Sequence, residues 1–379
     1  MKVLLKAEQE LSKNQIRINF MAKIFIATNH SYMLYRFRKE LIAELLKENS
    51  VTLSMPFVGH EKDFEAMGCK CINTEIDRRG INPKTDLKLL FTYFKQIKRE
   101  NPDKIITYSI KPNIYCGIAA SLFRIPYFVN VQGLGTAFQS KKLAPVVTAM
   151  YKTATKKAKT VFFENTANAQ EFINRKILKK EQITVLNGAG INLDTFKFSE
   201  YPDDSVVKFL YLGRIMKEKG IDELFDAFLR LKNEFGDKVS LDIVGFFEDE
   251  YKEIIDNLSE KKIINFHGFQ TDTVPYYQNC SCVVLPSYHE GLSNVLLEAS
   301  ATGRPVITSD IPGCKETVDN NKTGYLVKVK DSDDLYDKMK NFVLLSAEEK
   351  SIMGKNARTK MQNEFDKKQV VKNTIEKII

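Results

Sequence analysis

The sequence has few of the residues from which structural metal sites and disulfide frameworks are built. It contains six cysteines and four histidines in 379 residues, and no two cysteines have the C-x-x-C spacing. The pairs Cys69/Cys71 and Cys280/Cys282 are each separated by a single residue. A structural zinc site needs four ligands at characteristic spacings, so this pattern argues against a metal cluster and predicts reduced thiols in or beside strands.

Long apolar runs are also missing. No window approaches the roughly 18 to 20 uncharged apolar residues of a membrane span, and the first 20 residues lack the apolar block of a secretion signal. We therefore expect a cytoplasmic protein without a membrane-spanning segment. Residues 1–20 do not fit the pattern that follows them and are interpreted as an N-terminal extension, with a short membrane-surface helix as the alternative.

The net charge of +9 is distributed unevenly along the chain. Residues 1–190 contain 31 Lys and Arg against 16 Asp and Glu, a balance of +15, whereas residues 191–379 contain 26 against 32, a balance of −6. A basic half indicates an anionic partner such as phosphate, membrane lipid or nucleic acid, although a solvated positive surface remains an open alternative.

Short apolar segments alternate with amphipathic helical patterns in both halves. A chain of 379 residues is too long for a single hydrophobic core of ordinary size, so two domains are expected. Alternation of strands and helices predicts doubly wound α/β domains with parallel sheets. The predicted strands lie at 23–28, 51–57, 104–109, 127–132, 161–164 and 183–187 in the first half, and at 208–213, 240–245, 264–269, 282–287, 305–310 and 324–329 in the second.

The polar stretch at 187–205 separates these two series of strands. We predict a first Rossmann-like domain at 21–190 and a second at 191–379, with packing of the C-terminal helix back onto the first domain as one option. Ligands of such folds bind beyond the carboxyl ends of the strands. Two domains of this type predict a binding cleft between them.

One segment of the second half combines two glutamates with a helix start. In PSYHEGLSNVLLEAS, Glu290 follows a predicted strand and Glu298 lies about two turns into the following helix. Free amides at a helix start attract anions, and ionised carboxylates accept hydrogen bonds from vicinal hydroxyls. Gly213, Arg214 and Lys219 follow the first strand of the same half, where the two cations can neutralise a diphosphate. Together these groups predict a sugar-nucleotide site.

The ordered combination of GRIMKEKG, PSYHEGLSNVLLEASATGRPVITSD and GCKETVDNNKTGYLV resembles the donor-binding half of retaining GT-B glycosyltransferases of family 4. This resemblance covers nearly all of residues 183–330. It implies that Arg214 and Lys219 contact the donor diphosphate, that Glu290 holds the transferred sugar and that Glu298 holds the ribose. The backbone amides implied to face the sugar or phosphate are those of Gly291, Leu292 and Ser293. The alternative to these ligand contacts is a purely structural role for both residues, with Glu298 as a solvated helix residue and Lys219 as a surface lysine.

The first half resembles bacterial transferases that extend sugars on undecaprenyl diphosphate, through TYSIKPNIYCGIAA and NVQGLGTAF. The resemblance implies an acceptor side lined by Lys111, Asn113 and the loop Gly133-Leu134-Gly135. Arg38 is a candidate ligand of the acceptor's diphosphate. Many relatives carry a Gly-Gly loop after the first strand, whereas this chain has TNHSYM, so the roles of Asn29 and His30 stay open.

Other enzyme classes fit the sequence less well. A nicotinamide enzyme would need a third glycine at its proper place in the GLGTAF segment and an acidic residue about 20 positions later, at the end of a second strand. A metal-dependent transferase could use the DSDD segment, but Asp331 or Ser332 is better interpreted as a helix N-cap. A UDP-sugar epimerase of the same fold would need more acid and base groups in the cleft. No nucleic-acid-binding motif is recognised.

The resulting hypothesis is a retaining hexosyltransferase that uses a nucleotide sugar, most simply a UDP-sugar, and needs neither a cofactor nor a metal. The expected acceptor is a saccharide linked to a lipid diphosphate, in the synthesis of capsule, O-antigen or another bacterial glycan. A peripheral position on the cytoplasmic membrane face is predicted from residues 141–160, which contain six lysines and no acidic residue. Apolar Leu143, Val146, Val147, Met150 and Tyr151 interleave with these lysines. A helix packed on its own sheet is the alternative for this segment.

Overall fold

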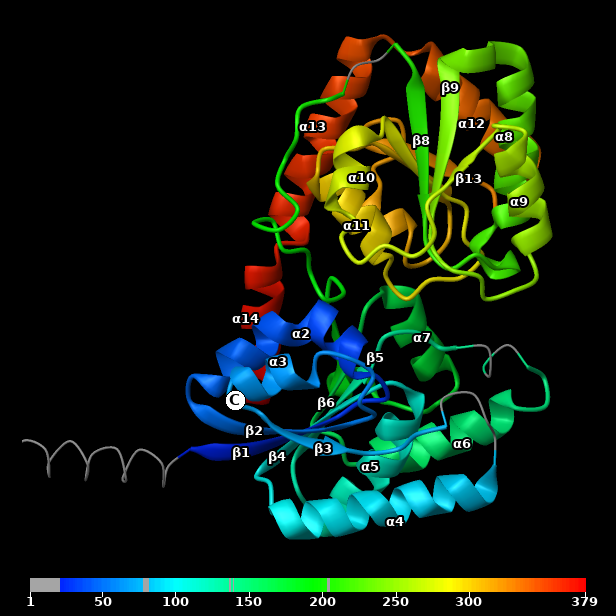
Figure 1. The fold of residues 1–379 in the computed structure, drawn as a ribbon. Helices are drawn as coiled ribbons and strands as arrows, with labels where there is room; N and C mark the ends of the chain where they lie inside the picture. The colour runs from blue at the N-terminus through cyan, green and yellow to red at the C-terminus, as the bar shows by residue number, and fades with distance from the viewer. Residues whose placement is uncertain (1–20, 78–81, 136–137, 139, 203–204) are drawn as a thin grey trace, which may run out of the picture. The chain divides into compact units, whose positions relative to one another are not determined.

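The computed structural model describes residues 21–77, 82–135, 138, 140–202 and 205–379. The chain forms two compact units (Figure 1). The first contains the chain up to Phe163, Ala169–Leu186 and Val371–Ile379, and the second contains Glu164–Asn168 and Asn187–Val370. The predicted N-terminal extension, residues 1–20, lies outside the described residues.

The first unit is built on a parallel sheet of seven strands in the order β3-β2-β1-β4-β5-β6-β7. Its strands are Ala22–Ala27 (β1), Asn49–Met55 (β2), Lys70–Asn73 (β3), Lys104–Tyr108 (β4), Tyr127–Val131 (β5), Thr160–Phe163 (β6) and Ile183–Val185 (β7). Its helices are Ser31–Leu46 (α2), Glu61–Ala66 (α3), Pro83–Glu100 (α4), Ile110–Phe123 (α5), Ala144–Thr155 (α6), Thr166–Asn174 (α7), which begins among residues of the second unit, and the short turn Lys180–Gln182 (η2).

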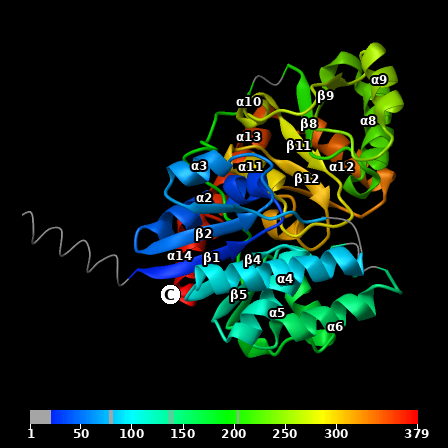
Figure 2. The same ribbon diagram turned by 60° about the horizontal axis from the view of Figure 1, so that its bottom comes forward.

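Both faces of this sheet are covered, which explains the nearly continuous apolar strands. In β1, Phe25 packs in the core under α4 and α5, whereas Ile24 and Ile26 pack in the core under α2. Figures 1 and 2 show α4, α5 and α6 as one helical layer and α2 and α3 on the opposite face of the sheet. Neighbouring helices of the α4–α5–α6 layer contact each other.

The second unit has a parallel sheet of six strands in the order β10-β9-β8-β11-β12-β13. Its strands are Val207–Leu212 (β8), Val239–Val244 (β9), Asn265–Phe266 (β10), Cys282–Leu285 (β11), Val306–Ser309 (β12) and Gly324–Val327 (β13). Its helices are Ile221–Phe235 (α8), Lys252–Glu260 (α9), Val274–Asn279 (α10), Asn294–Ala301 (α11), Ser332–Leu344 (α12) and Ala347–Glu364 (α13), with short turns at Lys217–Lys219 (η3), Gly236–Lys238 (η4) and Lys315–Thr317 (η5). Helix α14, Lys367–Ile378, begins in the second unit, and its residues from Val371 onward belong to the first.

The doubly wound α/β class predicted from the sequence is confirmed for both units. Strand β3 was not among the predicted strands. It has four residues, it forms the edge of its sheet and its end residues Lys70 and Asn73 are exposed, so it lacks the apolar signal of a buried strand. Within the described ranges, no helix has the length and apolar character needed to cross a bilayer.

A buried arginine, Arg304, holds three segments of the second unit together. Arg304 has no exposed surface, and its guanidinium donates hydrogen bonds to main-chain carbonyls that include those of Tyr277, Gln278 and Ser199. These bonds tie the end of α10 and the residues before β8 to the turn after α11. Burial lowers the pKa of Arg304, but the ring of carbonyl oxygens compensates for the lost hydration.

Candidate functional site

The loops that follow β8, β9 and β10 are joined by main-chain hydrogen bonds. The amide of Gly213 donates to Val244 O at 3.0 Å, that of Ile215 to Phe246 O at 2.9 Å, and that of Gly245 to Gly268 O at 2.9 Å. A side chain at Gly245 would place its Cβ 1.8 Å from Gly213 O, so this close approach requires glycine. The predicted residue Gly213 therefore lies in a tightly packed edge of the sheet, at the carboxyl ends of its strands.

Lys219 and Glu290 meet at this edge. Lys219 Nζ lies 2.5 Å from Glu290 Oε1, and Ser287 Oγ donates to the same oxygen at 2.9 Å. Both side chains are largely buried, with exposed fractions of 15% for Lys219 and 13% for Glu290. The surface-lysine alternative for Lys219 is therefore wrong. The structure brings together two of the three residues predicted to act on the transferred sugar and its diphosphate.

A close backbone contact sets the separation of these two side chains. Gly220, next to Lys219, has a φ of +70°, and a Cβ there would lie 2.1 Å from Pro286 O. Glycine adopts this φ without strain and leaves room for the carbonyl. The amide of Tyr288 also donates to Glu218 O at 2.8 Å, so the Lys219 turn and the Glu290 loop are held against each other.

Arg214, the third of these residues, is held by its backbone rather than by its side chain. The hydroxyl of Tyr211 donates to Arg214 O at 2.6 Å, while the Arg214 side chain is 46% exposed and its Nη1 lies 4.0 Å from Glu248 Oε2. Burial, with a further contribution from the charge of Glu290, raises the pKa of Tyr211, so this hydroxyl stays a neutral donor. The guanidinium can thus reach a ligand from a fixed turn.

The loop between Glu290 and α11 is held by residues outside its own strand. Asn165 Nδ2 donates to Gly291 O at 2.5 Å, and Leu292 is buried. The amide of Ser293 donates to Gly313 O at 2.9 Å. Without a ligand the Ser293 amide is thus bonded to the neighbouring loop, and its predicted contact with a ligand stays a prediction. The amides of Gly291 and Leu292 stay predicted ligand contacts.

Glu298 is an interior residue of α11. It is 3% exposed and its Oε2 accepts a hydrogen bond of 2.9 Å from the hydroxyl of the fully buried Tyr277. This burial shows that the alternative of a solvated helix residue is wrong. A buried carboxylate needs hydrogen-bond donors such as the Tyr277 hydroxyl to offset the loss of hydration. Its predicted contact with ribose stays a prediction.

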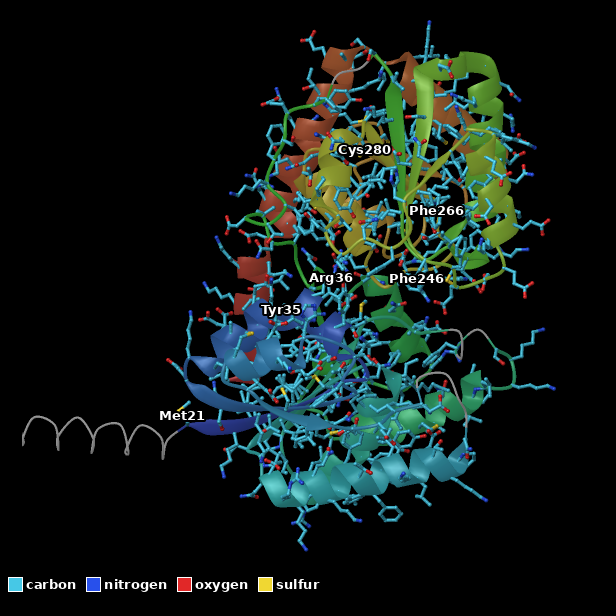
Figure 3. The ribbon with its side chains drawn as sticks, in the orientation of Figure 1. Met21, Tyr35, Arg36, Phe246, Phe266 and Cys280 are labelled. Carbon is cyan, nitrogen blue, oxygen red and sulfur yellow. The ribbon has the colours of Figure 1, made fainter. Side chains whose placement is uncertain are left out.

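The structure identifies supporting residues that the sequence analysis missed. Asn165, Tyr211 and Tyr277 each hold a predicted site residue or its loop, but single side chains at these places have no recognisable spacing. The exposed rings of Phe246 and Phe269 follow β9 and β10, with their centroids 6.0 Å apart. Figure 3 labels Phe246 at this loop edge of the second unit. Apolar residues in the loops at strand ends could have signalled this pair.

In the first unit, Lys111 lies at the start of α5 and pairs with Asp86 of α4, with Nζ 2.7 Å from Oδ1. The pair borders a cavity of about 540 Å³ whose lining includes Asn73, Asp77 and Thr85. The cavity lies where β3 ends and α4 begins, at the carboxyl edge of the sheet. This position is compatible with the acceptor role predicted for Lys111.

Two other predicted acceptor residues are bound into the first unit's own structure. Asn113 is 1% exposed, and its amide nitrogen donates to Asn130 O at 2.8 Å. Arg38 is 6% exposed, and its guanidinium lies over the ring of Tyr108 at 5.4 Å. Asn113 thus bonds to strand β5 and Arg38 packs on a ring of β4, and the acceptor contacts predicted for them stay predictions.

The remaining predicted acceptor residues lie in the loop after β5, and two residues whose roles were left open lie after β1. Gly133 and Gly135 follow β5, and Gly135 has a φ of +69°. Asn29 accepts a hydrogen bond of 2.8 Å from Ser109 Oγ, and His30 is the residue before α2. These contacts position two loops of one sheet edge, and the chemical roles of Asn29 and His30 stay open.

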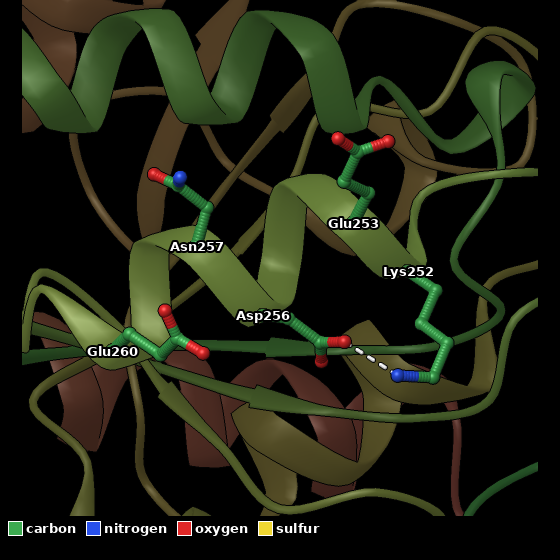
Figure 4. Close-up of a pocket in the computed structure, with 5 residues that line it drawn as sticks. All are labelled: Lys252, Glu253, Asp256, Asn257 and Glu260. Carbon is green, nitrogen blue, oxygen red and sulfur yellow. Dashed lines mark hydrogen bonds and ion pairs between the residues drawn. The ribbon is translucent and has the colours of Figure 1, made fainter.

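Two features lie apart from these residues. Asp331 caps α12 by accepting a hydrogen bond from Asp334 N at 2.9 Å, which confirms its N-cap interpretation. Figure 4 shows a hollow of about 430 Å³ along α9, where Lys252 pairs with Asp256 on a charged, solvated helix face. The described residues contain no group of three His, Cys, Asp or Glu side chains arranged to hold a metal, and the six cysteines are free thiols.

Comparison with known families and proteins gives a consistent result. The family "Glycosyl transferases group 1" matches residues 194–360, and the family "Glycosyl transferase 4-like" matches residues 23–165. A similar relative is an N,N'-diacetylbacillosaminyl-diphospho-undecaprenol alpha-1,3-N-acetylgalactosaminyltransferase of Campylobacter jejuni. It is 30% identical over 326 residues, which are 81% of this chain and 85% of the relative.

A second relative is the capsular polysaccharide biosynthesis glycosyltransferase CapM of Staphylococcus aureus, 28% identical over 76% of this chain and 79% of its own length. Among solved structures, HepE of Anabaena in complex with UDP superposes with a TM-score of 0.76 at 17% identity. That match covers 94% of this chain and 99% of HepE, and it supports the fold assigned here.

Proposed function

The chain belongs to the group 1 glycosyltransferases of family 4, which have the GT-B fold, and we propose that it transfers a hexose or N-acetylhexosamine from a UDP-sugar to a saccharide on a lipid diphosphate. The observation that carries this proposal is the Lys219–Glu290 pair at the start of α11, with Arg214 on the neighbouring loop. Cations suit a diphosphate, and the carboxylate suits the hydroxyls of the sugar beside it.

The buried Lys219–Glu290 pair explains how a site for a charged donor is kept ready. Without a ligand, each charge satisfies the other in a largely dehydrated position, where an isolated charge would be costly. The lysine ammonium has three donors, so it can bind a phosphate oxygen while it keeps a bond to the glutamate. Glu290 would then lie within reach of the hydroxyls of a sugar attached to that phosphate.

The nucleotide is proposed to be a uridine diphosphate. Phe246 and Phe269 expose aromatic faces at the ends of β9 and β10, where a base could stack on one ring. The complex of the fold relative HepE with UDP supports this choice. The ribose would lie between the base and Glu298, whose carboxylate is held in place by Tyr277.

Transfer requires stabilisation of the departing diphosphate. As the bond from the sugar carbon to the phosphate oxygen breaks, negative charge grows on that oxygen, and Arg214, Lys219 and the amides of Gly291 and Leu292 can stabilise it. We propose that the acceptor hydroxyl attacks from the same face and gives its proton to the leaving phosphate, which retains the anomeric configuration. The two cations supply the charge that a metal supplies elsewhere, so we expect full activity in EDTA.

The proposed acceptor follows from the relatives. The Campylobacter protein acts on a diphospho-undecaprenol saccharide and CapM acts in capsular polysaccharide synthesis, so we propose a comparable acceptor and a place in bacterial surface glycan synthesis. The relatives are transferases, which favours transfer over the alternative of epimerisation. An acceptor of this kind lies in a membrane, and the basic first half of the chain suits the anionic lipids of a cytoplasmic leaflet.

A panel of UDP-sugars tests the proposal directly. We expect one UDP-hexose or UDP-N-acetylhexosamine to bind and to be hydrolysed slowly, with and without EDTA. Glu290→Gln should lower turnover most, because Glu290 lies at the reacting sugar, and Glu298→Gln should weaken donor binding most. Binding of no UDP-sugar, or a product that is only an epimer of the donor, would overturn the assignment.

A further inference from the structure

Helix α4 presents an unusual outward face. Its inner face, which includes Leu89, Tyr93 and Ile97, is buried in the core of the first unit. The opposite face forms a stripe at helical spacing, and we name it the α4 stripe: Lys84, Leu87, Lys88, Phe91, Lys95 and Lys98. Leu87 is 53% exposed and Phe91 is 56% exposed. Two large apolar side chains thus lie in the middle of a row of lysines.

The adjacent end of α5 extends this apolar surface. Leu122 is 64% exposed and Phe123 is 38% exposed, and the ring of Phe123 lies 5.6 Å from that of Phe94 on α4. Figure 2 shows α4 and α5 in the same layer, on one face of the sheet. Arg124 follows directly and is exposed. Exposed apolar groups thus lie on both helices of this layer, and the rings of Phe94 and Phe123 lie between them.

The acidic residues of α4 itself are paired with cations, while Glu75 and Asp77 line the cavity at one edge of the stripe together with Lys88. Asp86 is turned toward Lys111, and Glu100 accepts bonds from Lys70 at 2.6 Å and from Arg99 at 2.8 Å. Both carboxylates are largely buried, at 14% and 9% exposed. The outward lysines of the stripe are exposed beside them. A surface with central apolar groups and surrounding cations complements an anionic lipid bilayer.

The neighbouring helix α6 has a different surface. Of the apolar residues that interleave with its lysines, Tyr151 is buried, and Val147 and Met150 pack against the core, whereas Val146 is exposed. This packing fits the alternative of a helix on its own sheet, and the lipid contact predicted for residues 141–160 stays a prediction that rests on their lysines. Lys152, Lys156, Lys157 and Lys159 still face outward and extend the positive surface.

We infer that the α4 stripe, with Leu122 and Phe123, is the surface by which this protein docks on an anionic bilayer, with Leu87 and Phe91 entering the boundary between headgroups and acyl chains. This inference rests on the proposed function in one respect, since a lipid-linked acceptor gives the membrane contact its purpose. The lysines provide attraction that weakens with salt, and the apolar groups provide attraction that does not.

Vesicle sedimentation of the full chain tests this docking. The probes are phosphatidylglycerol/phosphatidylcholine vesicles and vesicles of phosphatidylcholine alone. We expect wild-type protein to bind the anionic vesicles only, and L87S/F91S to bind them at least about tenfold more weakly, since two large apolar side chains no longer enter the lipid. The matched control L344S removes an equally exposed leucine from the second unit and should leave vesicle binding unchanged.

A second comparison separates the apolar contact from general charge. K152Q/K156Q/K157Q/K159Q should weaken binding at low salt and lose most of this effect at high salt, whereas the loss in L87S/F91S should persist. Equal binding by L87S/F91S and wild type would overturn the inference. A wild-type dimer in light scattering that becomes monomeric in L87S/F91S would also overturn it, in favour of a second copy as the occupant.

An activity measurement distinguishes this inference from the proposed function. L87S/F91S should match wild type on a short water-soluble acceptor and lose activity on the same saccharide embedded in vesicles. If neither protein transfers sugar to either acceptor while vesicle binding follows the expected pattern, the proposed function fails and the docking surface stands. If L87S/F91S keeps full activity on the embedded acceptor, the docking surface fails.

Discussion

The two units share one architecture, a parallel sheet covered by helices on both faces, yet they use their predicted site residues differently. In the second unit, Lys219 and Glu290 meet at the loop edge of the sheet and form an ion pair. In the first unit, Asn113 and Arg38 are buried and contact their own sheet, and Glu298 of the second unit is buried as well. Burial alone does not separate residues that hold the fold from residues that bind a ligand, so variants of both units are needed to separate them.

The largest expected effect tests the chemical role of the second unit. Lys219→Ala should lower kcat/KM by at least about tenfold, because the departing diphosphate loses a cation. The activation barrier should rise by up to roughly 3 kcal/mol. Lys217→Ala is the matched control, since Lys217 lies on the same turn and is exposed. Steady-state kinetics with the accepted UDP-sugar measures both. Arg214→Ala should resemble Lys219→Ala, and near-wild-type rates for both variants would remove the diphosphate assignment.

A smaller effect is expected where a neighbouring loop supports this site. Asn165→Asp keeps the oxygen that accepts from Asn168 N but loses the donor to Gly291 O. The loop before α11 should then be less well fixed, and the KM for the donor should rise by about tenfold, equivalent to about 1.4 kcal/mol. Circular dichroism should show a folded protein. A change in thermal stability with no change in donor KM would make Asn165 a purely structural residue.

The first unit should respond in the opposite way. Asn113→Ala leaves Asn130 O without its 2.8 Å donor, so the free energy of unfolding should fall by about 1 to 3 kcal/mol while the KM for the acceptor changes little. Urea denaturation and acceptor kinetics measure the two quantities, with the exposed Asn174→Ala as control. A large rise in acceptor KM at unchanged stability would break the contrast between the units.

The smallest effect concerns thiol reactivity. Burial, with the nearby charges of Glu65 and Glu61, raises the pKa of Cys71 to about 11. The reactive thiolate is therefore scarce at neutral pH, and alkylation should accelerate as the pH rises toward that value. Cys71 is partly exposed, whereas Cys280 and Cys282 are buried. Mass spectrometry of iodoacetamide-treated native protein should find Cys71 modified first, and earlier labelling of the second unit's thiols would contradict this order.

The sequence predicted the fold to a large extent, because strands buried on both faces give apolar segments that stand out between amphipathic helices. The short edge strand β3 was not predicted, because half of its residues are exposed and it therefore lacks the apolar pattern of a buried strand. The meeting of Lys219 and Glu290 was predictable because both belong to contiguous motifs at strand ends. Asn165 was not predictable, because it bonds to Gly291, which lies 126 positions away in the sequence. No local sequence pattern indicates a contact between residues so far apart in the chain.

The C-terminal helix has a consequence for how the chain acquires its structure during synthesis. Helix α14 starts among residues of the second unit, but Val371–Ile379 belongs to the first, where Ile378 is buried in the core that contains Leu34 and Leu41. A ribosome produces this segment after all of Asn187–Val370. The core between α2 and the sheet therefore lacks one of its pieces until translation of the second unit is over, so the unit that is begun first is completed last.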